Sequence, residues 1–171
     1  MKFYLTPIKR LYLSMSSFDD GRQIVEIINN DFLYRGEIKN NMFDGFGEIY
    51  TKDYEYFGEF KDGYMHGDGV CKFKSNNCTY DGNFYKSLKN GYGKVILFDR
   101  TIIEGIFCND KLNKALVRYP NKEVLECIFI NGLINGIARS IFPNGDIVEK
   151  EYKDSKIIRT LRKEKLSMNQ Y

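Results

Sequence analysis

One pattern constrains this sequence more than any other: Tyr-x-Gly, followed eleven residues after the tyrosine by Gly-x-Gly, occurs three times. The tyrosines are Tyr34, Tyr56 and Tyr80, and the glycine pairs begin at Gly45, Gly67 and Gly91. A pattern that recurs at fixed spacing indicates one structural unit repeated along the chain, with each unit packed on its neighbours.

The same frame extends in both directions with weaker conservation of the glycines. The leading positions are large and apolar or aromatic throughout and lie 22 to 24 residues apart: Tyr12, Tyr34, Tyr56, Tyr80, Ile103, Leu125 and Val148. The fourth copy has Lys114 and Leu116 at the positions of the glycine pair, and the fifth has Gly136 and Ala138. The copy that begins at Val148 retains only its first strand.

Alternation of residue size within each copy predicts β-strands. Side chains of a strand alternate between its two faces, so Tyr56, Gly58 and Phe60 share one face. A small residue between two large ones lets an aromatic ring lie flat over the glycine backbone. A single 22-residue hairpin cannot offset an ordering cost of about 1–2 kcal/mol per residue, whereas stacked hairpins share one apolar face. We therefore predict an all-β, open, single-layer antiparallel solenoid of about six stacked hairpins.

The repeat resembles the MORN (membrane occupation and recognition nexus) repeat. Its pattern, Tyr-x-Gly-x-Phe followed by Gly-x-Gly, is clearest at residues 56–69 and 80–82, and the resemblance covers about residues 12–158. The resemblance implies an array of hairpins with an aromatic-lined groove. It also implies a scaffold or adaptor at cytoskeletal or membrane-proximal structures, and some members have been proposed to bind phospholipids.

Three functions stay open on this basis. The leading hypothesis is a non-enzymatic scaffold that binds protein partners along the groove, with these candidate residues: Tyr34, Tyr56, Phe60, Tyr80, Phe84 and Tyr92. The second is a peripheral phospholipid-binding module. The third is a regulatory subunit of an enzyme supplied in trans.

No residues form a recognisable catalytic constellation, and we expect neither an enzyme nor a cofactor. His66, the one histidine, lies beside a predicted turn with no nucleophile placed near it by a motif. Glu37 and Glu59 occupy equivalent positions of successive repeats, which favours a solvated face over a catalytic pair. The Gly-x-Gly pairs lack the following helix that a phosphate-binding loop requires.

The four cysteines, at positions 71, 78, 108 and 127, contain no C-x-x-C pair, so we expect neither a zinc site nor another metal site. A two-residue turn at Asn76–Asn77 would pair Cys78 with Ser75 and Cys71 with Gly82. That register separates the two sulfur atoms and predicts free thiols.

Positive charge gathers at the C-terminal end. Residues 150–165 contain seven bases and three acids, against a net charge of +3 for the whole chain. Ile157, Ile158 and Leu161 would share one face of a helix, which favours a short capping helix. The alternative is a contact with anionic lipid through five bases: Lys156, Arg159, Arg162, Lys163 and Lys165. A charge of +4 near an anionic surface gives about 4 kcal/mol, which corresponds to only about millimolar affinity.

These observations define the expected organisation. Residues 1–11 form an N-terminal segment, residues 12–158 the repeat array and residues 159–171 the basic tail. The N-terminal residues lack a secretory signal pattern, so we expect a cytoplasmic protein peripheral to a membrane or the cytoskeleton. The partners we expect are proteins and an anionic membrane surface. Homodimerisation through a terminal repeat is also open, whereas nucleic acid is not expected because the repeats lack a basic stripe.

Overall fold

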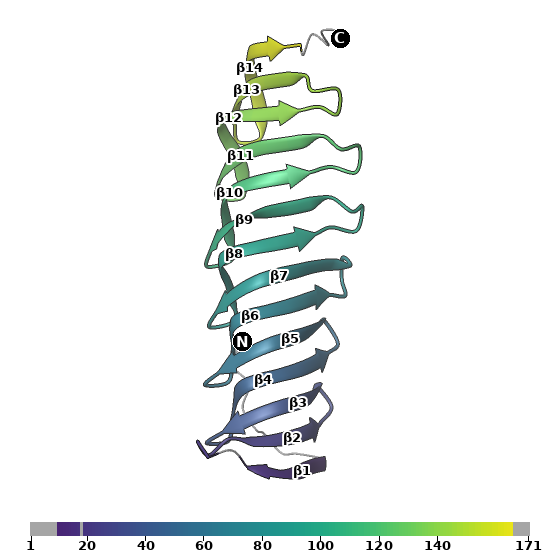
Figure 1. Ribbon diagram of the computed structural model, residues 1–171, viewed down its shortest axis with the longest axis vertical. Helices are drawn as coiled ribbons and strands as arrows, with labels where there is room; N and C mark the ends of the chain where they lie inside the picture. The colour runs from purple at the N-terminus through teal and green to yellow at the C-terminus, as the bar shows by residue number, and fades with distance from the viewer. Residues whose placement is uncertain (1–9, 18, 166–171) are drawn as a thin grey trace, which may run out of the picture. The chain divides into compact units, whose positions relative to one another are not determined.

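The computed structural model describes residues 10–17 and 19–165, with side chains described for residues 19–165. The described residues form fourteen strands and no helix, in an open antiparallel sheet whose strand order follows the sequence (Figure 1). The strands are β1 (Arg10–Ser17), β2 (Gln23–Ile28), β3 (Phe32–Lys39), β4 (Met42–Thr51), β5 (Tyr54–Lys61), β6 (Tyr64–Phe73), β7 (Cys78–Tyr85), β8 (Leu88–Ile96), β9 (Ile102–Cys108), β10 (Lys111–Arg118), β11 (Val124–Ile130), β12 (Leu133–Ile141), β13 (Ile147–Lys153) and β14 (Lys156–Glu164). The all-β hairpin array predicted from the repeat is confirmed.

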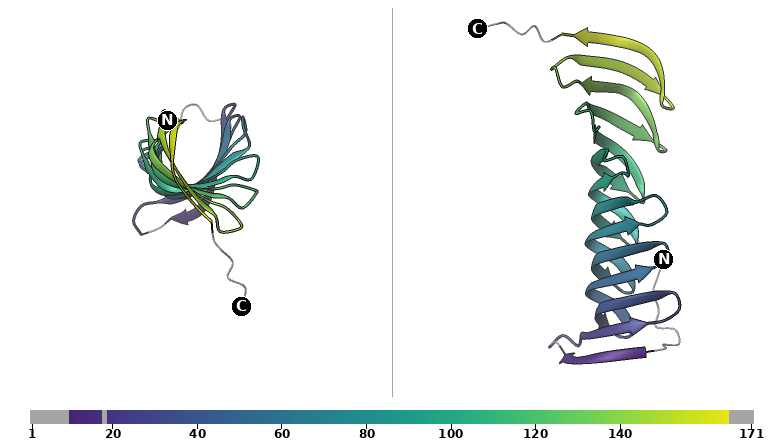
Figure 2. Two further views of the ribbon diagram at one scale, coloured as in Figure 1. Left: turned by 90° about the horizontal axis from the view of Figure 1, so that it is seen from above. Right: turned by 90° about the vertical axis from the view of Figure 1, so that its right-hand side faces the viewer.

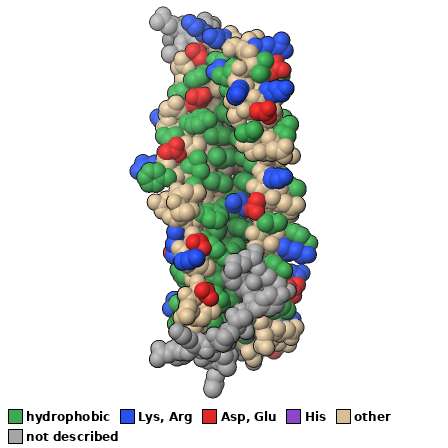
Figure 3. All heavy atoms as spheres, turned by 180° about the vertical axis from the view of Figure 1, so that it is seen from behind, with side chains coloured by type: hydrophobic (Ala, Val, Ile, Leu, Met, Phe, Trp, Pro, Cys, Tyr) green, Lys and Arg blue, Asp and Glu red, His purple; other side chains and the backbone are tan. Residues whose placement is uncertain are grey.

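The chain divides into two compact units, Met1–Gly91 and Tyr92–Tyr171. Within each unit the strands curve, so that one face of the sheet is hollowed (Figure 2). Hydrophobic side chains gather along the hollow, and charged side chains lie mostly along its margins (Figure 3). We call the face that bears the buried side chains the inner face and the opposite one the outer face.

Six hairpins close through two-residue turns in which both central residues have positive φ. This geometry is the type I′ turn, whose twist matches that of the paired strands. Asparagine, aspartate and glycine, which tolerate positive φ, supply most of these positions. The turns are Asn40–Asn41, Asp62–Gly63, Lys86–Ser87, Asn109–Asp110, Asn131–Gly132 and Asp154–Ser155.

Three of these turns are hydrogen-bonded to the preceding hairpin. The backbone N–H of Gly63 donates to the carbonyl of Phe43 at 2.9 Å, and Ser155 donates in the same way to Ile134 at 2.8 Å. The N–H of Ser87 donates to the carbonyl of Met65 at 2.9 Å. Both serines also accept a hydrogen bond through Oγ. The N–H of Met65 donates to Ser87 Oγ at 3.1 Å, and the N–H of Ile134 donates to Ser155 Oγ at 2.9 Å. Each of these turns therefore joins two repeats.

The paired glycines of unit 1 form one row across five strands. Gly36 lies opposite Gly47, which lies opposite Gly58, and the row continues to Gly69 and Gly82. The lead tyrosine of each hairpin covers this row: a Cβ at Gly47 would lie 2.7 Å from Tyr34 Oη. A Cβ at Gly69 would lie 2.5 Å from Tyr56 Cε2. The row is glycine because the tyrosine rings leave no space for a side chain.

The hydroxyl of each covering tyrosine is also satisfied. Tyr34 Oη donates to the carbonyl of Glu37 at 2.6 Å, and Tyr56 Oη donates to the carbonyl of Glu59 at 2.8 Å. Tyr80 Oη donates to the carbonyl of Asn83 at 2.9 Å. Each bond spans three residues, so the ring is fixed to its own strand as well as to the glycine beneath it.

Glu37 and Glu59 have a structural contact that the sequence did not reveal. The carboxylate of Glu37 accepts the backbone N–H of Phe46 at 3.2 Å, and that of Glu59 accepts the N–H of Asp68 at the same distance. Both bonds lie at a β-bulge that begins with a positive-φ glycine, Gly45 or Gly67. The expectation that these carboxylates are simply solvated is corrected: both are half-buried, and they satisfy the backbone of the bulge.

The aromatic side chains of unit 1 pack edge to face along the inner face. Phe60 contacts both Tyr34 and Tyr56, with ring centroids 5.4 and 5.1 Å apart and interplanar angles of 88° and 85°. Phe84 contacts Tyr56 and Tyr80 at 5.2 and 5.0 Å in the same geometry. Aromatic pairs in this geometry contribute about 0.5–1.5 kcal/mol each beyond the area that they bury. Each phenylalanine thus links two successive repeats.

Unit 2 builds its core from smaller side chains. Val117, Leu125, Cys127 and Ala138 are buried and pack against half-buried Ile103, Phe129, Ile134 and Tyr152. Ala115 lies opposite Gly105, so alanine takes the place of the second glycine of the pair in the fourth repeat. The expected assignment of Lys114 and Leu116 to those positions is wrong by one residue, because the bulge of β10 has one residue fewer than the bulges of β4 and β6.

Two further expectations differ from the structure. Cys78 pairs with Phe73, and Cys71 pairs with Tyr80, so the connection is the four-residue loop 74–77 and not a two-residue turn at Asn76–Asn77. The C-terminal segment is not helical: residues 156–164 form β14, which pairs with β13 through two bulges. The bulges at Ile158 and Leu161 account for the apolar spacing that imitates a helix.

Replacement of Gly69 by alanine tests the tyrosine–glycine contact. We expect Gly69→Ala to lower the free energy of unfolding by about 2–3 kcal/mol, because the added methyl group overlaps the Tyr56 ring. Urea denaturation followed by circular dichroism measures the change. Gly132→Asn is the control, because no atom lies within 4 Å of a Cβ at that turn and asparagine tolerates its positive φ. Equal stability of the two variants would contradict the packing role.

Candidate protein-interaction surface

The predicted partner-binding rings lie mostly in the core. Tyr34, Tyr56 and Tyr80 are 0% exposed, Phe60 is 3% exposed and Phe84 is 5% exposed. These five rings offer almost no surface to a partner, because they pack on one another and on the glycine row. Tyr92 differs: it is 58% exposed and lies between two glycines of β8, on the outer face.

Four positions near the turn of each hairpin face outward, and the repeats can be compared at these positions. Two positions lie on the first strand, three and five residues after the lead residue. The other two lie on the second strand, directly after the turn and at the bulge. The five full hairpins have Glu37, Lys39, Met42 and Phe46; Glu59, Lys61, Tyr64 and Asp68; Asn83, Tyr85, Leu88 and Tyr92; Ile106, Cys108, Lys111 and Lys114; and Ile128, Ile130, Leu133 and Ile137.

The β11–β12 hairpin alone in this set is apolar at all four positions. Ile128, Ile130, Leu133 and Ile137 are 44%, 57%, 42% and 60% exposed, and Ile130 lies directly opposite Leu133. Ile106, 49% exposed on β9, is separated from this hairpin by β10. We call the four residues of the β11–β12 hairpin the outer patch. Scattered exposed apolar residues are ordinary, but a contiguous set marks an interaction site.

Lysines without an ion pair among the described residues border the outer patch on both sides. Lys114 lies directly opposite Ile128 on β10, and Lys111 lies nearer the turn on the same strand. On the other side, Lys153 of β13 lies opposite Lys156 of β14. All four side chains are exposed.

Charges farther from the turns on the outer face are compensated. Arg118 pairs with Glu104 at 3.3 Å, and Arg139 pairs with Glu126 at 3.6 Å. Arg159 pairs with Glu151 at 2.6 Å. The lysines that border the patch, by contrast, have positive charge that no ion pair among the described residues compensates.

The five predicted lipid-binding bases do not share one face. Arg159 and Arg162 lie opposite Glu151 and Glu149 on the outer face, whereas Lys163 lies opposite Val148 on the inner face. Arg162 also forms an ion pair with Glu164. Lys156 adjoins the last turn, and Lys165 directly follows β14. The strand thus separates bases that a helix would have brought together.

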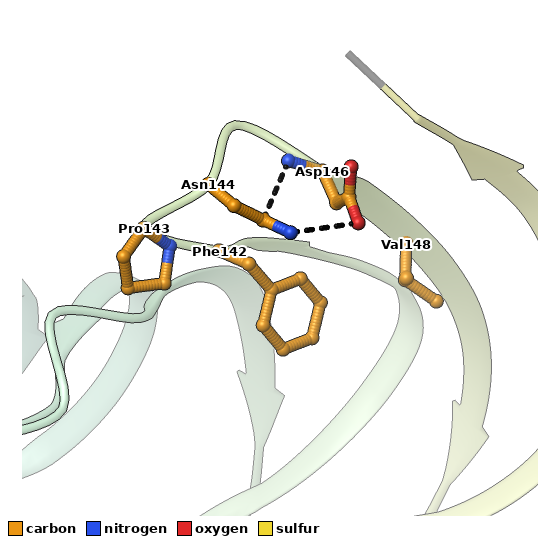
Figure 4. Close-up of a pocket in the computed structure, with 5 residues that line it drawn as sticks. All are labelled: Phe142, Pro143, Asn144, Asp146 and Val148. Atoms are coloured by element: carbon orange, nitrogen blue, oxygen red, sulfur yellow. Dashed lines mark hydrogen bonds between the residues drawn. The ribbon is translucent and has the colours of Figure 1, made fainter. Parts of the chain in front are cut away.

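A hollow of about 410 Å³ opens beside the loop between β12 and β13 (Figure 4). Phe142 and Val148 supply apolar walls, and Asn144 Nδ2 donates to the Asp146 carboxylate at 2.9 Å. The loop closes through N–H bonds from Phe142 to the carbonyl of Asp146 and from Gly145 to that of Phe142. The same hydrogen bonds close the loops at residues 97–101 and 119–123. The loop is therefore a regular part of the repeat, and we do not interpret the hollow beside it as a ligand site.

The remaining reactive groups occupy structural positions. His66 lies on β6 and not in the turn itself, and its ring centroid is 5.3 Å from that of Tyr85. All four cysteines are free thiols. Burial raises the pKa of Cys71 to about 12 and that of Cys127 to about 11. Among the residues described, no His, Cys, Asp and Glu side chains cluster as metal ligands, and no helix is long and apolar enough to span a membrane.

Fold and surface together define a class: an antiparallel β-hairpin repeat protein with a buried aromatic inner face. The family model of the MORN repeat matches four segments, at residues 34–54, 56–78, 80–99 and 128–147. The chain belongs to the MORN-repeat family. The MORN repeat is a non-enzymatic repeat module, which suggests a repeat scaffold or binding module.

Comparison with curated proteins finds no match. Among solved structures, one similar chain is the wild-type TCP10 domain of Danio rerio CPAP in complex with a peptide of Danio rerio STIL. The similarity covers 90% of this chain and 99% of that one, with 14% sequence identity and a TM-score of 0.30. Values this low carry no information about function.

The repeat consensus does not reveal the outer patch, because none of the consensus positions lies on the outer face. The signal was nonetheless present: Ile128 and Ile130 lie on the face opposite Leu125 and Cys127, so β11 is apolar on both faces. A strand with one solvated face should alternate apolar and polar residues. The departure from alternation marks the patch.

Alkylation tests the assignment of the thiols. We expect iodoacetamide at pH 8 to modify exposed Cys108 readily and to leave Cys71 and Cys127 unmodified in the folded protein. Burial shields both thiols and raises their pKa, so the reactive thiolate is scarce at that pH. Peptide mass spectrometry measures the modification of each site. Urea-unfolded protein is the control, in which all four thiols should react.

Proposed function

We propose that this protein is a non-enzymatic scaffold that binds a protein partner through the outer patch. The observation that supports this proposal most directly is the contiguous exposure of four isoleucine and leucine side chains on the outer face of the β11–β12 hairpin. Five of the six rings predicted from the sequence to bind a partner are buried in the core, and Tyr92 alone of the six is exposed. Binding therefore falls to a surface whose residues the fold leaves exposed.

The size of the patch limits the affinity that it supplies alone. Burial of a fully exposed isoleucine or leucine stabilises by about 1.5–3 kcal/mol, so four half-exposed side chains give about 4 kcal/mol. Association costs at least about 4 kcal/mol in lost translational and rotational freedom. The patch can act as the apolar centre of an interface, and polar contacts around it must contribute the rest of the affinity.

The finer parts of the proposal concern location and additional partners. A scaffold with this repeat would act at cytoskeletal or membrane-proximal structures, in the cytoplasm. A regulatory subunit of an enzyme supplied in trans is a special case of the same proposal, since the outer patch would then bind the catalytic chain. Homodimerisation would use the terminal strand β14, whose outer edge pairs with no described strand.

Phospholipid binding is the alternative function, and the C-terminal bases are the observation in its favour. Their distribution over two faces of β14 and the ion pairs of Arg159 and Arg162 reduce the charge available to a membrane. Cosedimentation with vesicles of graded phosphatidylserine content tests it. We expect any binding at low salt to disappear at 0.15 M salt, because it depends on weak screened charges. Binding that persists there and is lost in Arg162→Glu/Lys163→Glu would favour the lipid alternative.

Photocrosslinking tests the scaffold proposal. A benzophenone amino acid at Leu133 should form adducts with a partner in a lysate of the source cells. The same group at Met42, which holds the equivalent position in the first repeat, is the matched control and should not form them.

Two polar replacements complete this test. Ile128→Thr/Ile137→Thr should reduce the adducts at least tenfold, because threonine preserves the strand and removes apolar surface. Phe46→Thr, at the position equivalent to Ile137, should leave them unchanged. Adducts that form equally from both crosslinking positions, or that survive the double substitution, would contradict binding through the outer patch.

A further inference from the structure

The lysines beside the outer patch indicate what kind of partner it binds. This inference rests on the proposed function and extends it. Lys111 and Lys114 lie on β10, and Lys153 lies on β13, so positive charge borders the β11–β12 hairpin on both sides. Adjacent strands lie about 4.8 Å apart, which places β10 and β13 about 14 Å from each other. An α-helix with side chains is about 10–12 Å in diameter.

We propose that the outer patch binds an amphipathic helix whose apolar stripe is bordered on both sides by aspartate or glutamate. The helix lies along the β11–β12 hairpin, with its apolar stripe against Ile128, Ile130, Leu133 and Ile137. Its acidic margins then fall beside the lysines of β10 and β13. Lysine side chains are long enough to reach the flanks of a helix seated between them.

The internal repeats support this pairing of apolar and basic residues. In the first two hairpins, a lysine occupies the position of Ile130, next to the glutamates Glu37 and Glu59 of the same strand. In the β11–β12 hairpin both of those charged positions are isoleucine, and lysines occupy the neighbouring hairpins instead. The glutamate and lysine that lie on the first strand of those hairpins are therefore both absent from β11. The acid that lies opposite Ile137 on β13, Glu151, is paired with Arg159.

A second copy of the chain fits this surface poorly. If two outer patches faced each other across a two-fold axis, the lysines of one copy would approach those of the other. Like charges in a shared interface oppose association. An acidic partner is therefore favoured over self-association.

An anionic membrane is also disfavoured by the turns. The Asn131–Gly132 turn lies between two turns that contain the carboxylates of Asp110 and Asp154. A bilayer that approached the hairpin tips would meet these acids first. A helix that lies on the outer face is in contact with the lysines and not with the tips.

Fluorescence anisotropy with the full chain and three labelled peptides tests the proposal. Each peptide is an 18-residue helix with a leucine stripe, bordered on both sides by glutamate, glutamine or lysine. We expect the glutamate peptide to bind at least tenfold more tightly than the glutamine peptide at 0.05 M salt. The advantage should shrink at 0.3 M salt, and the lysine peptide should bind most weakly. Equal binding of the glutamate and glutamine peptides would overturn the proposal.

Charge-reversal variants locate the effect. Lys114→Glu/Lys153→Glu should lower the affinity for the glutamate peptide at least tenfold and raise that for the lysine peptide. The control is Lys39→Glu/Lys61→Glu, at positions equivalent to Ile130, which should change neither. Unaltered binding in the first variant would also overturn the proposal.

Two measurements identify the rejected occupants, and either positive result would overturn the proposal. One is vesicle binding at 0.15 M salt that is lost in Ile128→Thr/Ile137→Thr. The other is a dimer in sedimentation equilibrium that the same substitution dissociates. If the peptides fail but crosslinking from Leu133 still depends on Ile128 and Ile137, the scaffold function stands and only the acidic helix is wrong.

Discussion

The contact between a tyrosine ring and a glycine backbone is the interaction on which unit 1 depends. Tyr34 and Tyr56 cover Gly47 and Gly69 so closely that a Cβ would overlap the ring, and each hydroxyl is bonded to its own strand. This contact fixes the ring orientation that lets Phe60 pack edge to face between two tyrosines. A single sheet thereby buries a core without a second layer to cover it.

Unit 2 uses the same hairpins with a different distribution of apolar residues. Its inner face loses most of the glycines and aromatic rings, and aliphatic residues such as Val117 and Leu125 fill the space. Its outer face gains Ile128, Ile130 and Ile137, which contribute nothing to the core that is described. Within one chain, the repeats serve as references for one another, and the exposed isoleucines depart from the pattern without a structural reason.

The fold could be predicted from the sequence because the repeat fixes strand, face and partner together. The spacing of Tyr56, Gly58 and Phe60 already implies a ring over a glycine. The register of β10 could not be predicted, since no residue type in the strand indicates that its bulge is one residue shorter than those of unit 1. The sequence of β14 favours a helix because two bulges displace Ile158 and Leu161 from strict alternation. The outer patch lies outside the consensus, so a search for the consensus passes over it.

The turn that is bonded to the preceding hairpin has a consequence for how such a chain evolves. Gly63, Ser87 and Ser155 each donate to a carbonyl in the hairpin before them, so at these three junctions a hairpin meets the same acceptor on its predecessor. Duplication or excision of a complete repeat preserves that junction, whereas an insertion of a few residues within a strand destroys it. Gene length in this lineage should therefore change in steps of one hairpin, with new surface properties arising by divergence of a duplicated copy.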